Sequence, residues 1–361
     1  MRAILAKTQS RCARARAWSE RVGFRRLCIS GLLMICPAAL SAHPPYTLVV
    51  DERGNAYFSD IEAVWKLAPD GRLSLFRPAV ADKHVHEIAL ADGAVEGERN
   101  EYDAATETYR GGIWRRTLDG RETWLLAPTN AAPTGMGIRR DQAGNRYVAQ
   151  WVGNDDRRTM LFRRSPDGKV TLLFGPADAA ARFRQVVATS VGGMVFPADG
   201  SVILADGSAL RRVDAGGKVT TPYQGPAKAA LRGLAIARDG RILAADAGRK
   251  AVFAIALSGE AEQLYASPAG WIATAAAEAQ GRLLVLEANA DPYDYVRRMR
   301  VVAAERGGVR VLAEPWKGAS PAAGGPAPER SDAWGIALPA ALAAFAAAAA
   351  AMAVGRRRRT G

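Results

Sequence analysis

Residues 46–77 read YTLVVDERGNAYFSDIEAVWKLAPDGRLSLFR and contain four short apolar segments. A turn that ends at Gly54 separates the first two segments, a polar loop follows, and a turn that ends at Gly71 separates the last two. Short apolar runs between turns of Gly, Asp and Asn are typical of β-strands joined by hairpins. The stretch therefore predicts a small antiparallel sheet, which needs neighbouring sheets to bury both of its faces.

The same pattern occurs six times along the chain of 361 residues. The glycines that end the first turn of each copy are Gly54, Gly93, Gly144, Gly200, Gly240 and Gly281. Those that end the second turn are Gly71, Gly120, Gly168, Gly217, Gly259 and Gly308. A four-stranded unit repeated at a period of about 40 to 50 residues is typical of a β-propeller. We therefore predict an all-β fold, a six-bladed β-propeller over residues 43–315, whose core between blades includes Trp65, Trp114 and Trp124.

The N-terminal residues 1–42 have the three parts of a secretory signal peptide. Arg25 and Arg26 precede the apolar run 27–36, and small residues follow as far as Ala42. The apolar run is shorter than a helix that spans a bilayer, so we expect a cleaved signal rather than an uncleaved anchor. The three cysteines of the chain all lie in this leader, so the mature protein is expected to form no disulfide and no thiolate metal site.

A second membrane signal follows the repeats. Residues 316–333 are rich in Pro, Ala, Gly and Ser, which is the composition of a linker. Residues 334–354 form a run of 21 residues without a charge, long enough to cross the hydrocarbon core. The arginines 356–359 in the tail 355–361 lie where the positive-inside rule expects cytoplasmic charge. We therefore predict a transmembrane helix at 334–354, rather than an Ala-rich soluble helix, and an exported propeller on the extracytoplasmic (periplasmic) side of the cell membrane.

The formal net charge of +13 is concentrated at the two ends of the chain. The first 42 residues carry a net charge of +7 and the tail arginines carry +4, which leaves +2 for the residues between them. A protein that binds nucleic acid needs a basic surface on its folded body. The sequence therefore predicts no nucleic-acid partner, and it predicts a membrane contact through the C-terminal helix.

The turn sequences of residues 51–57 (DERGNAY) and 165–168 (SPDG) resemble those of the NHL-repeat propellers and of the gluconolactonase (senescence-marker) family of six-bladed propellers. The resemblance covers all six repeats. It implies a divalent metal in the central channel, held by Glu, Asn and Asp at the starts of first strands. The corresponding positions here are Tyr46, Val85, Met136, Gly192, Arg232 and Ala273. A hard cation needs several oxygen ligands, and none of these six residues is a carboxylate or an amide, so we expect no cofactor. A divalent metal is the alternative. If the matched positions are shifted by one or two residues, the site gains only Glu87 as a ligand.

Two of the three histidines stand together at the start of the second repeat, in the sequence His84-Val85-His86-Glu87. Side chains alternate along a strand, so His84 and His86 are expected on one side and Glu87 on the other. Two imidazoles on one side suit a zinc or copper ion or acid–base chemistry. The alternative interpretation is a polar rim that is hydrogen-bonded to neighbouring blades.

A set of six polar residues, which we call the ring, lies six positions after the first-turn glycines: Asp60, Arg99, Gln150, Asp206, Asp246 and Glu287. An Asp at the end of a strand often accepts hydrogen bonds from the backbone of the next turn, and we expect this role for most of them. The longest insertions, 99–111, 151–158 and 288–295, follow second strands. They are therefore expected on the same face of the propeller as the ring.

These residues together predict a polar site of mixed charge at one end of the channel. The candidate ligand-binding residues are His84, His86, Glu87, Arg232, Trp271, Trp151, Asp60, Asp206, Asp246 and Glu287. The sequence favours a membrane-anchored, non-catalytic module that binds a small polar ligand or an envelope protein. One alternative is a hydrolase or lyase of the gluconolactonase-like type that uses His84, His86 and Glu87 at the channel mouth. The other is an inert scaffold.

Overall fold

The structure is a computed structural model that describes residues 47–80, 83–85, 87–103, 108–129, 138–152, 158–175, 193–289, 298–305 and 308–315. The chain divides into two compact units, Met1–Ala319 and Ser320–Gly361, and every described residue belongs to the first. The predicted signal peptide, linker, transmembrane helix and tail lie outside the described residues. Within the described ranges, no helix has the length and apolar character needed to cross a membrane.

The described residues form 24 strands in six antiparallel sheets, which we call blades 1 to 6. Blade 1 contains β1 (Leu48–Val50), β2 (Ala56–Ser59), β3 (Val64–Leu67) and β4 (Leu73–Arg77). Blade 2 contains β5 (Lys83–His84), β6 (Ile88–Ala91), β7 (Ala94–Asp103), β8 (Thr108–Thr117) and β9 (Glu122–Thr129). Blade 3 contains β10 (Arg146–Val152), β11 (Arg158–Arg164) and β12 (Val170–Phe174).

The other three blades have four strands each. Blade 4 contains β13 (Met194–Val195), β14 (Val202–Asp206), β15 (Ala209–Val213) and β16 (Val219–Gln224). Blade 5 contains β17 (Leu231–Ile236), β18 (Ile242–Asp246), β19 (Ala251–Ile255) and β20 (Ala261–Ala266). Blade 6 contains β21 (Trp271–Ala279), β22 (Arg282–Asn289), β23 (Met299–Glu305) and β24 (Gly308–Ala313).

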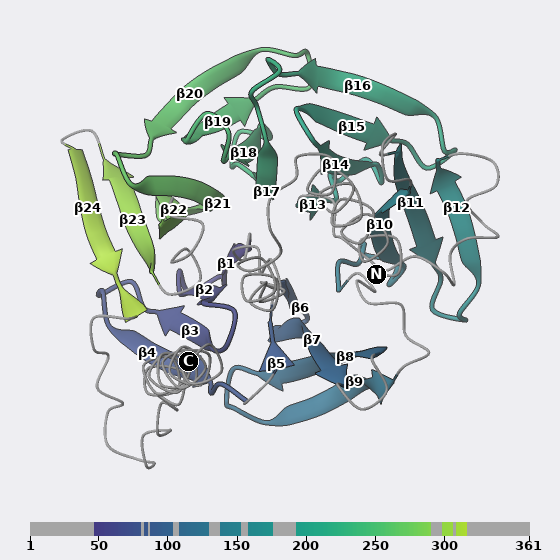
Figure 1. Ribbon diagram of the computed structural model, residues 1–361, viewed down its shortest axis with the longest axis horizontal. Helices are drawn as coiled ribbons and strands as arrows, with labels where there is room; N and C mark the ends of the chain where they lie inside the picture. The colour runs from purple at the N-terminus through teal and green to yellow at the C-terminus, as the bar shows by residue number, and fades with distance from the viewer. Residues whose placement is uncertain are drawn as a thin grey trace, which may run out of the picture. The chain divides into compact units, whose positions relative to one another are not determined.

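The blades stand around a central axis in chain order, with the first strands inside and the last strands outside (Figure 1). This arrangement confirms the predicted all-β, six-bladed propeller. Two blades depart from four strands. Blade 2 has the extra strand β5, which pairs with the far end of β7. In the described part of blade 3, a single bridge between Arg140 and Arg146 stands in place of a first strand.

All twelve predicted turn glycines have positive φ angles. Gly54 at +82° and Gly71 at +88° are examples. A side chain makes this left-handed conformation unfavourable, which is why glycine closes these turns. The two glycine turns of each repeat, between the first and second strands and between the third and fourth, lie at one end of the propeller, which we call the hairpin face. The connections between second and third strands and between blades lie at the other end, which we call the loop face.

Side chains of each second strand alternate between the two neighbouring blades. In β2, Tyr57 packs toward blade 2 and Phe58 packs toward blade 6, and both are fully buried. Because every blade is built from one contiguous stretch of chain, the ring closes without a shared sheet. It closes through an apolar interface of blade 1 with blade 6, to which Phe58, Leu286 and Val301 contribute.

The three tryptophans predicted to fill the core have different environments. Trp114 is fully buried in blade 2, as predicted, and Trp65 is partly buried against the blade 6–blade 1 interface. Trp124 is 41% exposed, so its prediction as a core residue was wrong. It lies on β9, the outermost strand of its blade, where the guanidinium of Arg99 lies 5.4 Å from its ring centroid.

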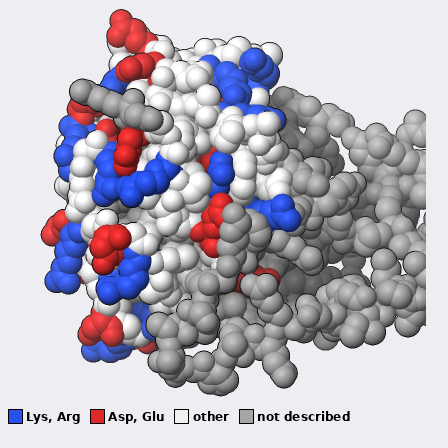
Figure 2. Space-filling model, turned by 90° about the vertical axis from the view of Figure 1, so that its left-hand side faces the viewer, with Lys and Arg blue, Asp and Glu red and all other residues white. Residues whose placement is uncertain are grey.

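On the side drawn in Figure 2, residues of both charges are interspersed among uncharged ones.

Gly97 leaves the space that the indole of Trp114 occupies. A Cβ atom at residue 97 would lie 2.1 Å from Cζ2 of Trp114. We therefore expect Gly97→Ala to lower the free energy of unfolding by about 1–3 kcal/mol, the usual cost of an overpacked core. Chemical denaturation measures this loss. In the double variant Gly97→Ala/Trp114→Phe, the smaller ring should recover part of the lost stability. If the free-energy changes of the two single variants simply add in the double variant, the proposed clash is contradicted.

Candidate functional site

Three carboxylates of the predicted ring are held by arginines on the loop face. Asp206 accepts a hydrogen bond from Nε of Arg211 at 3.0 Å. Asp246 accepts one from Nε of Arg249, and Glu287 accepts one from Nε of Arg300 at 2.7 Å. The side chains of Asp246 and Glu287 are fully buried, whereas those of the three arginines are 12–32% exposed. The negative charge therefore lies inside, and the positive group lies between it and the solvent.

Glu287 joins blade 6 to blade 5. Its Oε1 accepts a hydrogen bond at 2.8 Å from the hydroxyl of Tyr265 on β20, the outermost strand of blade 5. Arg300 lies directly across the strand pair from Glu287, and its guanidinium stacks 3.9 Å from the ring centroid of Trp271. Burial and the nearby charge of Glu287 raise the pKa of Tyr265. One ring face of Trp271, a predicted ligand-binding residue, is therefore occupied by Arg300.

Asp246 has the equivalent environment one blade earlier. Its Oδ1 accepts hydrogen bonds from the backbone N–H groups of Ala230 and Arg249, at 2.9 Å and 3.0 Å. Arg249 in turn donates from Nη2 to the hydroxyl of Tyr223 on β16, the outermost strand of blade 4. Asp246 thus makes the turn-capping bonds that the sequence predicts, and it also fixes an arginine.

Asp60 is held without an arginine. It accepts hydrogen bonds from the backbone N–H groups of Glu62 and Ala63 and from Nε1 of Trp65 at 2.7 Å. Burial raises the pKa of this carboxyl group, and the hydrogen bonds oppose that rise. The backbone contacts are again those expected of a strand-end Asp, so the role of Asp60 in this structure is to hold the connection from β2 to β3.

The same connection contains a strained residue. Ile61 has a φ of +83°, which is unusual for a β-branched side chain. Its N–H donates to Oγ of Ser59 at 2.8 Å, and Ser59 donates to the carbonyl of Val85 at 2.6 Å. These bonds attach the loop of blade 1 to the segment that follows His84. The position of the histidine segment is therefore tied to blade 1 as well as to blade 2.

The predicted histidine cluster is only partly described. His84 is half-buried in β5 and pairs with Asn100 on the far end of β7. His86 lies outside the described residues. Glu87 immediately precedes β6 and accepts a hydrogen bond from Nε of Arg139 in blade 3 at 2.7 Å. Glu87 is therefore engaged in an ion pair between blades.

Arg232 is exposed on β17, the innermost strand of blade 5. Its carbonyl accepts a hydrogen bond from the N–H of Gly193 at 2.7 Å, and its guanidinium has no polar partner among the described residues. The close contact requires glycine, because a Cβ at residue 193 would lie 2.4 Å from the nitrogen of Leu234. The backbones of the innermost strands of blades 4 and 5 therefore touch at the channel.

The remaining predicted residues are described in part. Trp151 lies in β10, but its side chain, like that of Gln150, lies outside the described residues. The insertion 99–111 belongs largely to the long strands β7 and β8, which pair with each other as far as Asp103 and Thr108. Most of the insertions 151–158 and 288–295 lies outside the described ranges. Among the residues that are described, no group of three or more His, Cys, Asp and Glu is placed to hold a metal ion.

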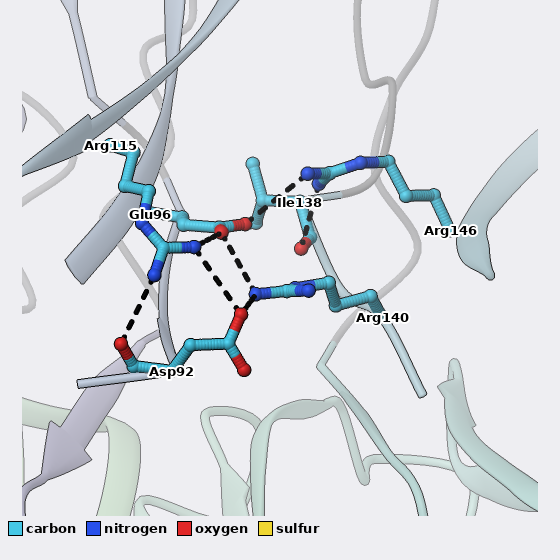
Figure 3. Close-up of polar contacts among 6 residues, drawn as sticks. All are labelled: Asp92, Glu96, Arg115, Ile138, Arg140 and Arg146. Carbon is cyan, nitrogen blue, oxygen red and sulfur yellow. Dashed lines mark hydrogen bonds and ion pairs between the residues drawn. The ribbon is translucent and has the colours of Figure 1, made fainter. Parts of the chain in front are cut away.

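A second charged cluster lies at the interface of blade 2 with blade 3, near the hairpin face (Figure 3). Glu96 is fully buried, and its carboxylate accepts bonds from Arg115, Arg140 and Arg146 at 3.1, 3.2 and 3.3 Å. Asp92, which is mostly exposed, also pairs with Arg115 and Arg140. Arg140 and Arg146 form the bridge that replaces the first strand of blade 3. These ion pairs therefore hold blade 3 against blade 2 at the position where a bridge replaces a first strand in the described part of blade 3.

Sequence reasoning missed the arginine partners and the Glu96 cluster. Glu96 occupies the second-strand position at which Tyr57 and Leu243 pack in blades 1 and 5. A carboxylate at an otherwise apolar position of the repeat was a signal for a buried ion pair. The arginine partners gave a weaker signal, since Arg300 is 13 residues from Glu287 and meets it only through strand register.

The comparisons with known proteins concern the fold. No protein-family model and no curated protein matches the sequence. A streptogramin B lyase structure is 14% identical, with a TM-score of 0.47, and the match covers 76% of this chain and 84% of that one. The virginiamycin B lyase of Staphylococcus aureus is 16% identical, with a TM-score of 0.44 and coverage of 74% and 83%. XC5397, a gluconolactonase of Xanthomonas campestris, is 13% identical, with a TM-score of 0.45 and coverage of 64% and 79%. The six-bladed β-propeller described above is structurally like these proteins at low identity.

Glu96→Gln should destabilise the propeller strongly. The change leaves three arginines facing a neutral group at the blade 2–blade 3 interface, and breaking a buried ion pair from one side costs about 3 kcal/mol or more. Thermal and chemical denaturation measure the loss. Asp92→Asn removes an exposed carboxylate from two of these arginines, Arg115 and Arg140, and it should have a much smaller effect. Equal losses for the two variants would show that the burial of Glu96 is not what matters.

Proposed function

We propose that the protein is a binding module that holds a small, polar, anionic ligand on the loop face of blades 4 to 6. The observation that supports this most directly is the repeated carboxylate–arginine pair. In Arg211, Arg249 and Arg300 alike, Nε is held by a carboxylate at the end of a second strand. An arginine fixed in this way has lost much of its side-chain freedom before a ligand arrives, which favours binding.

The charges also favour an anion. Asp246 and Glu287 compensate the charges of Arg249 and Arg300, so the exposed Arg232 on the innermost strand of blade 5 supplies the positive charge for an anion. Guanidinium groups bind carboxylates and phosphates through paired, charge-assisted hydrogen bonds. The hydroxyls of Tyr223 and Tyr265 lie in the same networks. The combination suits a hydroxylated carboxylate, which would accept from arginine and exchange hydrogen bonds with nearby polar groups.

The cellular setting of this module is part of the proposal. The leader at residues 1–42 and the apolar run at 334–354 support an exported protein that is anchored in the membrane, with its propeller outside the cytoplasm. A small anion or an envelope protein would then be the partner. The gluconolactonase-like enzyme would need His84, His86 and Glu87 at the channel mouth, and the ion pair of Glu87 with Arg139 does not favour that role.

Arg232→Ala tests the ligand site. We expect the affinity for hydroxylated carboxylates, with D-gluconate and L-malate as probes in calorimetry, to fall by about 1–3 kcal/mol, the contribution of a charged hydrogen bond. Stability should hardly change, because the side chain is exposed. Arg238→Ala is the matched control, since it removes the same charge from the hairpin face of the same blade. Equal losses in the two variants, or unfolding of Arg232→Ala with unchanged affinity, would contradict the proposed site.

A further inference from the structure

Neighbouring blades meet through contacts of two kinds. Two of the interfaces, that of blade 3 with blade 4 and that of blade 6 with blade 1, are packed by apolar side chains. Tyr147 of blade 3 and Phe196 of blade 4, for example, lie with their ring centroids 4.9 Å apart. Between the described residues of these blades, no hydrogen bond or ion pair crosses either interface. The other four interfaces are joined by directional bonds.

Blades 1 to 3 are joined to one another by such bonds. Arg77 at the end of β4 donates from Nε and Nη2 to the carboxylate of Glu122 on β9, in both cases at 3.1 Å. The N–H of Val85 donates to the carbonyl of Ile61 at 2.6 Å, so the backbone also joins blade 1 to blade 2. The Glu96 cluster joins blade 2 to blade 3. These three blades are thus fixed in one relative orientation.

Blades 4 and 5 are joined by both side-chain and backbone bonds. Arg249 of blade 5 donates from Nη2 to the hydroxyl of Tyr223 on β16 of blade 4 at 3.0 Å. The N–H of Leu231 on β17 donates to the carbonyl of Gly207, between β14 and β15, at 2.8 Å. Because hydrogen bonds weaken steeply when their angles change, these two fix how blade 5 lies on blade 4.

Blade 6 is attached to blade 5 at both ends of their interface. At the loop face, the hydroxyl of Tyr265 donates to the carboxylate of Glu287 at 2.8 Å. At the hairpin face, the N–H of Arg238 donates to the carboxylate of Glu278 at 2.8 Å. Bonds at two opposite ends oppose rotation of one blade against the other, so blades 4 to 6 also have a fixed relative orientation.

We propose that the propeller consists of two rigid halves, residues 47–175 (blades 1 to 3) and residues 193–315 (blades 4 to 6), which move apart along the two apolar interfaces. These interfaces lie opposite each other in the ring (Figure 1). Apolar contact is non-directional, so it can be remade after a small rotation or slide, as in hinge and shear motions. Opening any other interface breaks hydrogen bonds. Because the channel lies between the halves, their motion sets its width.

Thiol labelling of the native full chain distinguishes the interfaces. A buried thiol reacts only when its interface opens, so the labelling rate reports the free energy of that opening. Val213→Cys places a thiol between blades 3 and 4, and Val301→Cys places one between blades 6 and 1. Val252→Cys and Val302→Cys are matched controls between blades 5 and 6. All four valines are fully buried on third strands, and the cysteines of the leader are replaced by serine in every variant.

We expect the two thiols at the apolar interfaces to react at similar rates, at least about tenfold faster than the control thiols. The reason is that opening blade 5 from blade 6 also breaks a hydrogen bond to a charged group. Val301 and Val302 are neighbours on β23 that face opposite ways, so differences in strand stability do not enter their comparison. Equal rates for all four thiols would overturn the proposal. Fast labelling at the blade 6–blade 1 interface alone would also overturn it, because the ring would then open at a single interface.

Tyr265→Phe tests whether the polar bonds decide where the ring opens. The variant keeps the aromatic ring and removes the hydroxyl that reaches Glu287. The control thiols between blades 5 and 6 should then react about tenfold faster, while the thiols at the apolar interfaces keep their rates. Tyr147→Phe should leave the control thiols unchanged, because its hydroxyl bonds to Asp141 within blade 3. If Tyr265→Phe accelerates all four thiols equally, or none of them, the division into two halves is refuted.

Discussion

Closure of the ring between blade 1 and blade 6 is the contact on which the rest of the propeller depends. Each blade is made from one contiguous stretch of chain, so no hydrogen-bonded strand joins the first sheet to the last. The joint is made by side chains such as Phe58, Leu286 and Val301, which are fully buried. Burial of such side chains contributes roughly 1.5–3 kcal/mol each. The channel and the loop face exist only while this apolar interface holds the ring closed.

The interface of blade 2 with blade 3 is stabilised differently. Here the buried residues include Glu96, and three arginines surround it (Figure 3). A buried ion pair adds little net stability compared with apolar packing, although removing one partner is costly. Its directional bonds instead fix how blade 3 sits, which matters because only a bridge replaces its first strand in the described residues. The apolar interface of blade 1 with blade 6 thus contributes mainly stability, and the charged interface of blade 2 with blade 3 mainly fixes the orientation of the blades.

The repeat pattern predicted the fold because hairpin turns need glycine wherever φ is positive, and all twelve predicted glycines have that conformation. The same local pattern could not predict how blades 2 and 3 differ from the others, since strand number depends on pairing across the sheet. Trp124 was mispredicted because an outermost strand has a neighbour on only one side. The ring carboxylates could be found because they lie at a fixed spacing from the first-turn glycines. Their arginine partners could not, because a pair such as Arg300 and Glu287 is brought together only by the pairing register of two strands. Function was harder still, since turn motifs specify a scaffold and not the side chains it presents.

Native-state hydrogen exchange of a Phe58→Ala variant tests the importance of ring closure most directly. Phe58 is fully buried at the closure interface, and its truncation should cost about 3–5 kcal/mol. If closure holds the whole ring together, amides of β14 in blade 4 should lose as much protection as amides of β2 and β22, because opening at one interface exposes every blade. If protection falls only in blades 1 and 6 while β14 keeps its wild-type exchange, the blades are independently stable and ring closure is not the constraint described here.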